Sequence, residues 1–126
     1  MQKQQELPMS TNEQRILVHT EPGLRIAVDP KSISLLEAKE GDTIMWLDDG
    51  SSLRDARTIG ELQPIFARFG FIRTHRSYLV NLVAIRSIRK REHGPDWELT
   101  MHAPNERSLP ISRAELQHVW AAFGER

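Results

Sequence analysis

The chain has 126 residues, 39% hydrophobic and 27% charged, a composition typical of one globular domain. Its 17 Lys and Arg residues balance 17 Asp and Glu residues, and the lack of cysteine excludes disulfides, thiol catalysis and cysteine-based metal sites. No apolar run approaches the roughly 18 residues of a membrane helix, and the first 15 residues lack the apolar core of a signal peptide. We therefore expect a cytoplasmic protein without membrane contact.

The N-terminal segment differs in composition from the rest. Residues 1–14 are rich in Gln and other polar residues and have no apolar period, which predicts a flexible tail or linker. From Arg15 onward, short apolar runs alternate with Pro, Gly, Asp and Ser, as in proteins built from short strands. No internal repeat divides this part, so the sequence predicts one domain over residues 15–126.

Several of these runs have the period of a β-strand. Leu24, Ile26 and Val28 alternate with Arg25, Ala27 and Asp29, which predicts a strand with one buried face. Residues 44–47 are all apolar, so we expect a strand buried on both faces. The following Asp49–Gly50 pair predicts a hairpin turn.

The later strands are expected over residues 97–101 and 108–111. In the first, Trp97, Leu99 and Met101 alternate with more polar residues. The Pro104–Asn105 pair then predicts a turn. Pro110 cannot donate a ladder hydrogen bond, so we expect the second strand at a sheet edge.

The first predicted helix begins at a capping box formed by Thr58 and Glu61. Pro64 would remove an interior hydrogen bond. The helix is therefore expected either to bend at Pro64 or to start later, with Pro64 in its first turn. Its apolar stripe is Ile59, Leu62, Phe66 and Phe69.

The second predicted helix begins at Ser112 and Glu115, which also match a capping box, and stops at Gly124. Its apolar stripe follows helical spacing over Leu116, Val119, Trp120 and Phe123.

Charge is unevenly distributed along the chain. Residues 62–91 contain seven basic groups and no acidic group, while the flanking segments are acidic. Screening confines a field to roughly 8 Å in physiological salt, so this segment could attract a polyanion. A solvated basic face is the alternative. The seven residues are Arg68, Arg73, Arg76, Arg86, Arg89, Lys90 and Arg91.

The sequence has no Walker loop, nucleophile elbow, dinucleotide fingerprint or zinc-protease motif. The five histidines are dispersed without ligand-like spacing, and Asp48–Asp49 fits a turn better than an acid/base pair. We therefore expect no enzyme activity, cofactor or metal.

Residues 71–88, FIRTHRSYLVNLVAIRSI, place three basic side chains beside a short apolar anchor, Tyr78 to Leu82. This pattern predicts a projecting basic loop, and an arginine on such a loop can donate two hydrogen bonds to guanine. From the residues alone, an ordinary exposed hairpin remains the alternative.

This block, followed by WELTM and LPISR, resembles the LytTR family of DNA-binding domains, which close bacterial response regulators and some other transcription factors. Upstream matches are the SLLEAKEGD segment, the Asp49–Gly50 turn and the helix start at residues 58–62. The resemblance spans about residues 30–120. It implies a mainly β fold of stacked antiparallel sheets, with one short helix before the HRS loop and a C-terminal helix.

The resemblance also implies that loops, not a recognition helix, read DNA. Carried over by position, the contact regions are the segment from Lys39 to Thr43, Arg76 after the motif histidine, and Arg113. His75 and Ser77 would position Arg76. Glu37 and Asn81 are expected to be scaffold residues, with Asn81 capping the turn that holds the HRS loop. Phosphate contacts are expected from Arg89, Lys90 and Arg91.

These features predict a transcriptional regulator that binds duplex DNA through loops in the major groove. The partners expected are double-stranded DNA, a second copy on repeated sites and a regulatory protein. A protein-interaction module with the same fold but without DNA binding is the alternative.

Overall fold

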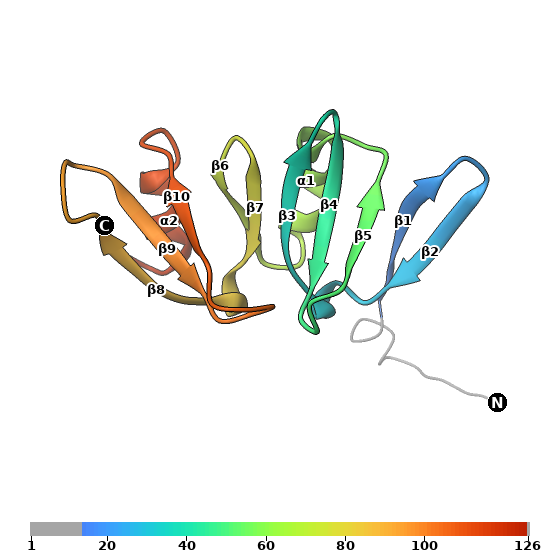
Figure 1. Cartoon of the computed structure of the whole chain (residues 1–126), viewed down its shortest axis with the longest axis horizontal. Coiled ribbons are helices and arrows are strands. Elements are labelled where there is room, and N and C mark those ends of the chain that lie inside the picture. The colour runs from blue at the N-terminus through green and yellow to red at the C-terminus, as the bar shows by residue number, and fades with distance from the viewer. Residues whose placement is uncertain (1–13, 126) are drawn as a thin grey trace.

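The computed structural model describes residues 14–125, which form three antiparallel sheets and two α-helices (Figure 1). The predicted mainly β architecture is confirmed, and the predicted tail lies, up to residue 13, outside the described residues. The elements are β1 (Ile16–Glu21), β2 (Leu24–Val28), η2 (Pro30–Ser32), β3 (Ile33–Lys39), β4 (Asp42–Leu47), β5 (Ser52–Asp55), α1 (Ile59–Ala67), β6 (Phe71–His75), β7 (Tyr78–Asn81), η3 (Leu82–Ala84), β8 (Ile85–Lys90), β9 (Trp97–Met101), β10 (Ser108–Ile111) and α2 (Leu116–Ala122).

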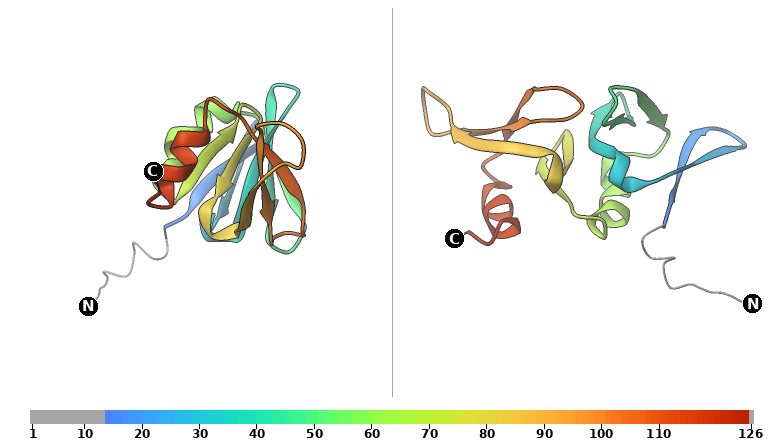
Figure 2. Two further views of the ribbon diagram at one scale, coloured as in Figure 1. Left: turned by 90° about the vertical axis from the view of Figure 1, so that its left-hand side faces the viewer. Right: turned by 90° about the horizontal axis from the view of Figure 1, so that it is seen from below.

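The sheets follow one another across the molecule. β1 pairs with β2, the central sheet has the order β5-β4-β3-β7-β6, and the third sheet has the order β10-β9-β8. Both helices lie on the same side of the strands (Figures 1 and 2). β10 is an edge strand, as Pro110 predicts.

The pair β3–β7 is buried on both faces. Leu35 and Leu36 of β3, and Leu79 and Val80 of β7, are each 0% exposed. Because neighbouring side chains on a strand point to opposite faces, Leu36 and Leu79 enter one core while Leu35 and Val80 enter another. The central sheet therefore separates two hydrophobic cores.

The neighbouring strand β4 also contributes to both cores. Met45 is buried in the first, and the partly buried Trp46 packs against the second. This arrangement confirms the prediction of a strand with two apolar faces at residues 44–47. The predicted turn at Asp49–Gly50 then leads into β5, and Gly50 takes a positive φ of 94°.

Helix α1 covers the first core and begins at the predicted capping box. The Thr58 side chain accepts a hydrogen bond from the Glu61 backbone N–H, and the Glu61 carboxylate accepts one from the Thr58 N–H. Pro64 lies inside a helix that starts at Ile59, so of the two alternatives the later start is wrong. Ile59, Leu62 and Phe66 are its buried residues.

The third sheet and α2 enclose the second core, in which Trp97 of β9 meets Trp120 of α2 edge to face at a centroid distance of 5.0 Å. This contact fastens the C-terminal helix to the sheet. The fully or largely buried members of this core include Leu99, Met101, Leu109, Ile111 and Val119.

The predicted capping box at the start of α2 is wrong. The helix begins at Leu116, and its N-cap Glu115 makes no side-chain capping bond. The Ser112 carbonyl accepts the Glu115 N–H in a preceding turn. At the other end, Gly124 stops the helix as predicted, with φ of 78° and an N–H bonded to the Ala121 carbonyl.

The β1–β2 hairpin buries less of its predicted face than expected. Val28 is buried and Ile26 partly buried, but Leu24 is 43% exposed. Leu24 directly follows the turn at Gly23, so it extends past the edge of the core.

Asp55 connects this hairpin to the central sheet. Its side chain is 0% exposed and accepts the His19 N–H at 3.0 Å and the Arg57 guanidinium at 2.8 Å. Burial alone would raise the pKa of Asp55, but the hydrogen bonds from the Arg57 side chain and from the His19 and Arg57 N–H groups outweigh it and lower the pKa. Arg57 also donates to the Leu17 carbonyl.

Replacing Asp55 with Asn should therefore lower the free energy of unfolding by about 2–4 kcal/mol at pH 7, because it breaks a buried ion pair. Since the folded pKa is lowered, the stabilisation is present above the ordinary Asp value of about 3.9 and is lost as pH falls through the folded pKa. Urea unfolding of both proteins at several pH values measures this. Glu21→Gln, at the exposed end of β1, is the matched control; equal effects of the two changes would contradict the assignment.

Candidate nucleic-acid interface

Three connections lie along the upper edge of the molecule in Figure 1, and a fourth, between β8 and β9, lies at its left end. They are the β3–β4 turn (residues 40–41), the β6–β7 turn (76–77), the β8–β9 loop (91–96) and the segment 112–115 between β10 and α2. We call this set the loop rim. All three contact regions expected from the sequence are at or beside it.

Backbone hydrogen bonds join parts of the loop rim that are far apart in sequence. The Ala38 N–H donates to the Ser77 carbonyl at 2.9 Å, which ties the end of β3 to the β6–β7 turn. The Ser112 N–H donates to the Thr74 carbonyl at 2.9 Å, which ties the segment before α2 to β6. These bonds hold three of the four connections in fixed relative positions.

Arg73 supports the β6–β7 turn from within the protein. Its Nε donates to the His75 carbonyl at 2.8 Å, one terminal nitrogen donates to the Arg76 carbonyl at 2.7 Å, and the other donates to Gln63 Oε1 at 2.6 Å. These three bonds use every nitrogen of the guanidinium. Arg73 therefore shapes the turn with three of its five N–H donors, and each of its nitrogens is bonded to a protein oxygen.

His75 supports the same turn in its neutral form. Its Nδ1 accepts the Ser77 N–H at 3.1 Å, and its ring packs against Tyr78 at a centroid distance of 5.6 Å. Burial, with the positive charges of Arg76 and Arg73, lowers the pKa of His75. A proton on Nδ1 would remove the bond to Ser77, so the geometry and the pKa agree.

Arg76 is the exposed residue at the tip of this supported turn. Within residues 14–125, none of the hydrogen bonds or ion pairs involves its side chain, although its carbonyl is held by Arg73. A fixed backbone therefore presents an uncommitted guanidinium, which can donate two parallel hydrogen bonds to a planar acceptor pair.

The first expected contact region, residues 39–43, spans the β3–β4 turn, and its two ends differ in exposure. Lys39 is exposed beside Glu40 and Gly41, whose φ angles of 52° and 88° form a tight hairpin. Thr43 is 0% exposed, and its hydroxyl donates to the Arg57 carbonyl at 2.9 Å. The expectation of a DNA contact by Thr43 is therefore wrong, because its side chain points into the protein and bonds there.

The three basic residues at the end of β8 differ in their partners. Arg89 and Arg91 both approach Glu98 of β9, with Nε to carboxylate distances of 3.4 and 3.6 Å. Lys90, between them, is exposed and has no ion pair among the described residues. Lys90 is thus the available charge of this group.

Acidic residues later in the chain also reduce the field expected from residues 62–91. Besides the two arginines at Glu98, Arg86 pairs with Glu106. The remaining basic residues of that segment, within the described part of the chain, are without an ion pair: Arg68, Arg73, Arg76 and Lys90. The segment is therefore less basic in space than in sequence.

Arg113 lies in the segment before α2 and is also paired. Its Nε donates to Asp96 Oδ1 in the β8–β9 loop at 3.0 Å, while the Arg113 side chain remains 74% exposed. The pairing joins the remaining connection, the β8–β9 loop, to the rest of the loop rim.

The two scaffold predictions have different outcomes. Glu37 accepts the Trp46 indole N–H at 3.0 Å, so its charge is used inside the protein as expected. Asn81 donates to the Ile33 carbonyl at 3.0 Å and caps η3 through the Val83 N–H. It lies at the end of β7 opposite the β6–β7 turn, so the prediction that it caps the turn that holds the HRS loop is wrong.

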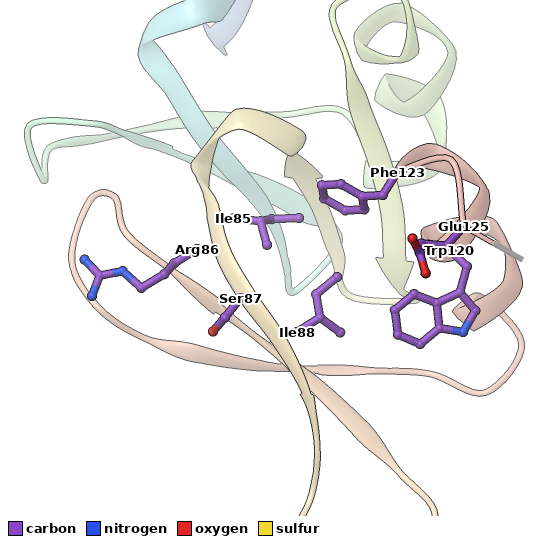
Figure 3. Close-up of a pocket in the computed structure, with 7 residues that line it drawn as sticks. All are labelled: Ile85, Arg86, Ser87, Ile88, Trp120, Phe123 and Glu125. Atoms are coloured by element: carbon purple, nitrogen blue, oxygen red, sulfur yellow. The ribbon is translucent and has the colours of Figure 1, made fainter.

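Away from the loop rim, an apolar hollow of about 250 Å³ lies between β8 and α2 (Figure 3). Ile85, Ile88 and Trp120 line it, and Phe123 is 46% exposed at its border. Among residues 14–125, no cluster of three or more His, Asp or Glu side chains is arranged to hold a metal ion. No helix in that range has the length and apolarity to cross a membrane.

Sequence reasoning missed the residues that hold the interface in place. Gln63 and Arg73 are hydrogen-bonded although they are ten residues apart in sequence, and Asp96 and Arg113 are hydrogen-bonded although they are 17 residues apart. The sequence showed only that residues 62–91 contain no acidic residue. It did not show which acidic residues later in the chain would approach the basic side chains of this segment.

The family model of the LytTr DNA-binding domain matches residues 24–124. A solved structure described as the LytTr DNA-binding domain of a methyl-accepting/DNA response regulator from Bacillus cereus has a TM-score of 0.70 to this chain. The match is 22% identical and covers 87% of this chain and 96% of that chain, so it shows the likeness of the fold. Among curated proteins, none matches.

The neutral state of His75 leads to a pH prediction. Because its folded pKa is lowered, we expect its NMR titration midpoint below the ordinary value of about 6.5. The unfolded chain then binds the proton more readily, so the free energy of unfolding falls as pH drops from about 6.5 towards the folded pKa. His75→Gln should remove this residue's part of the slope. A midpoint at or above 6.5 would contradict the bond from Ser77.

Proposed function

The chain belongs to the LytTR family of DNA-binding domains, and from this premise we propose that it is a transcriptional regulator whose loop rim reads duplex DNA in the major groove. The observation that carries the proposal is Arg76, an exposed and uncommitted guanidinium on a turn held by Arg73 and His75. Bidentate arginine to guanine O6 and N7 is the commonest specific contact with DNA, and the major groove displays that acceptor pair.

The remaining exposed donors suit phosphates. Lys39 ends β3 directly before the β3–β4 turn, and Lys90 ends β8 directly before the β8–β9 loop. These two connections lie on either side of the β6–β7 turn in Figure 1. Ser77 and the Nε2–H of neutral His75 add uncharged donors near the same turn. Arg89 and Arg91 can exchange their long contacts with Glu98 for phosphate oxygens. Phosphate contacts fix register without reading sequence.

We place the start of this domain at Arg15, before the family match at residue 24. β1 pairs with β2, and Ile16 and Val18 are buried in the first core, so β1 is part of the folded unit. One loop rim covers a short stretch of duplex, and specific sites usually need two half-sites. We therefore propose that two copies bind repeated sites. We further propose that the protein acts in the bacterial cytoplasm without catalysis and that a regulatory protein partner controls it.

The ion pairs at Arg86, Arg89 and Arg91 favour one alternative, an interaction module that keeps the fold and has lost DNA binding. A gel-shift assay on mixed duplex DNA at low salt separates the two, because even non-specific binding is strong there. Binding would support the proposed function, and no binding to any duplex would favour the alternative.

Arg76→Ala should weaken binding to the preferred duplex by about 1–3 kcal/mol and relax the preference at one base pair. Arg76→Lys should restore charge but little selectivity, because an ammonium group has no planar fork. Binding-site selection from random duplexes, followed by titration of each variant, measures both effects. Arg68→Ala removes one charge at the end of α1, away from the β6–β7 turn, and serves as the matched control. Equal loss for every sequence would make Arg76 a phosphate contact.

Lys90→Ala should weaken binding to all duplexes similarly and lower the slope of log K against log salt by about 1, because one fewer counterion is released. Arg86→Ala is the control on the same strand, since Arg86 lies at the opposite end of β8 and pairs with Glu106. Binding titrations between low and moderate salt give the slopes. An unchanged slope for Lys90→Ala would remove this residue from the DNA surface.

A further inference from the structure

We propose that Asp96 is a positioning residue that sets the sequence selectivity of Arg113. The inference rests on the proposed function, because it assigns a regulator of selectivity within the same loop rim. Asp96 is an acid at a surface expected to approach a polyanion, where its charge alone would oppose binding. Its contact with Arg113 gives it a different use.

The geometry of the pair leaves the reading edge of Arg113 available. Asp96 Oδ1 is bonded to Nε of the guanidinium at 3.0 Å. The two terminal nitrogens of Arg113 have no hydrogen-bond partner within residues 14–125, and the side chain is 74% exposed. These are the nitrogens that can donate together to guanine O6 and N7. Asp96 therefore holds the base of the fork and leaves its outer edge for DNA.

Both residues of the pair are anchored through their backbones. The Asp96 carbonyl accepts the Arg91 N–H at 2.8 Å, which closes the β8–β9 loop directly before β9. On the other side, the Ser112 N–H bonds to the Thr74 carbonyl directly before Arg113. An ion pair between two fixed backbone points restricts the rotamers of the arginine, so less side-chain entropy is lost when it contacts a base.

Stability gives little reason for such a pair. Asp96 is 46% exposed and Arg113 is 74% exposed, and exposed ion pairs contribute little to folding because solvent screens them. Removing the carboxylate should release Arg113 and also remove a negative charge beside the phosphates. The release of Arg113 should weaken specific binding, and the loss of the negative charge should strengthen non-specific binding.

Glu98 provides an internal comparison. It approaches Arg89 and Arg91 at 3.4 and 3.6 Å, and its side chain is 20% exposed. One carboxylate is shared by two guanidinium groups at distances longer than a good charged hydrogen bond. Such a contact lowers local charge without fixing either arginine, so we assign the positioning role to Asp96 alone.

The experiment compares Asp96→Ala, Asp96→Asn and Glu92→Ala in the full chain. Two probes are used: the duplex that the wild-type protein selects from a random library, and a duplex of the same composition in scrambled order. Glu92 is an exposed acid in the same loop with no ion pair among the described residues, so its removal changes charge without releasing Arg113. Thermal unfolding checks that each variant is folded.

We expect Asp96→Ala to lower the ratio of selected to scrambled affinity by about tenfold, within the range of one bidentate contact. Its affinity for the scrambled duplex should rise. Asp96→Asn keeps an oxygen that can accept from Nε and should restore most of the ratio. Glu92→Ala should raise both affinities and leave the ratio unchanged.

An Asp96→Ala protein with an unchanged ratio, or with both affinities raised equally as in Glu92→Ala, would overturn the positioning role. These results differ from failure of the proposed function, which would appear as equal wild-type affinity for the two duplexes or as no binding. Loss of folding in Asp96→Ala would also overturn the inference, because it would give the pair a structural role.

Discussion

The burial of β3 and β7 on both faces is the constraint on which the interface depends. A shift of one residue in their pairing would break the buried hydrogen bond from Asn81 to the Ile33 carbonyl and turn the Glu37 carboxylate to the opposite face, so the register is strongly fixed. That register brings the Ala38 N–H to the Ser77 carbonyl and thereby sets the β6–β7 turn beside the β3–β4 turn. The core therefore sets where these two turns lie, while Arg73 and His75 set the shape of the β6–β7 turn.

The charge that the loop rim offers to a ligand depends more on which basic side chains are paired than on how many there are. The chain is neutral overall, yet its arginines are in three different states: Arg73 is used inside a turn, Arg113 is held by one nitrogen, and Arg76 has no partner among the described residues. The difference between them lies in which donors remain for a ligand. A surface with few free cations limits non-specific attraction and leaves more of the binding energy to oriented contacts.

The two capping boxes show how far local patterns predict structure. Thr58 and Glu61 form the expected box, and among residues 14–125 their side chains bond only to the other residue of the pair. Ser112 matches the same pattern, but its N–H is bonded to β6 and its carbonyl closes a turn, so α2 starts later. The prediction from Pro110 was correct because proline has no backbone N–H to donate, which restricts its strand to a sheet edge in any fold.

Sequence patterns were sufficient to predict the strand-rich class, the Asp49–Gly50 turn, the helix stop at Gly124 and the family resemblance, because these depend on neighbouring residues and on short motifs in order. They also indicated Arg76 as the residue to examine. The burial of Thr43, the approach of Glu98 to two arginines and the contact between Asp96 and Arg113 could be seen only in the folded structure. Hydrogen bonds and ion pairs depend on distance in space, and the register of the sheets sets that distance, whereas the spacing of residues along the chain does not.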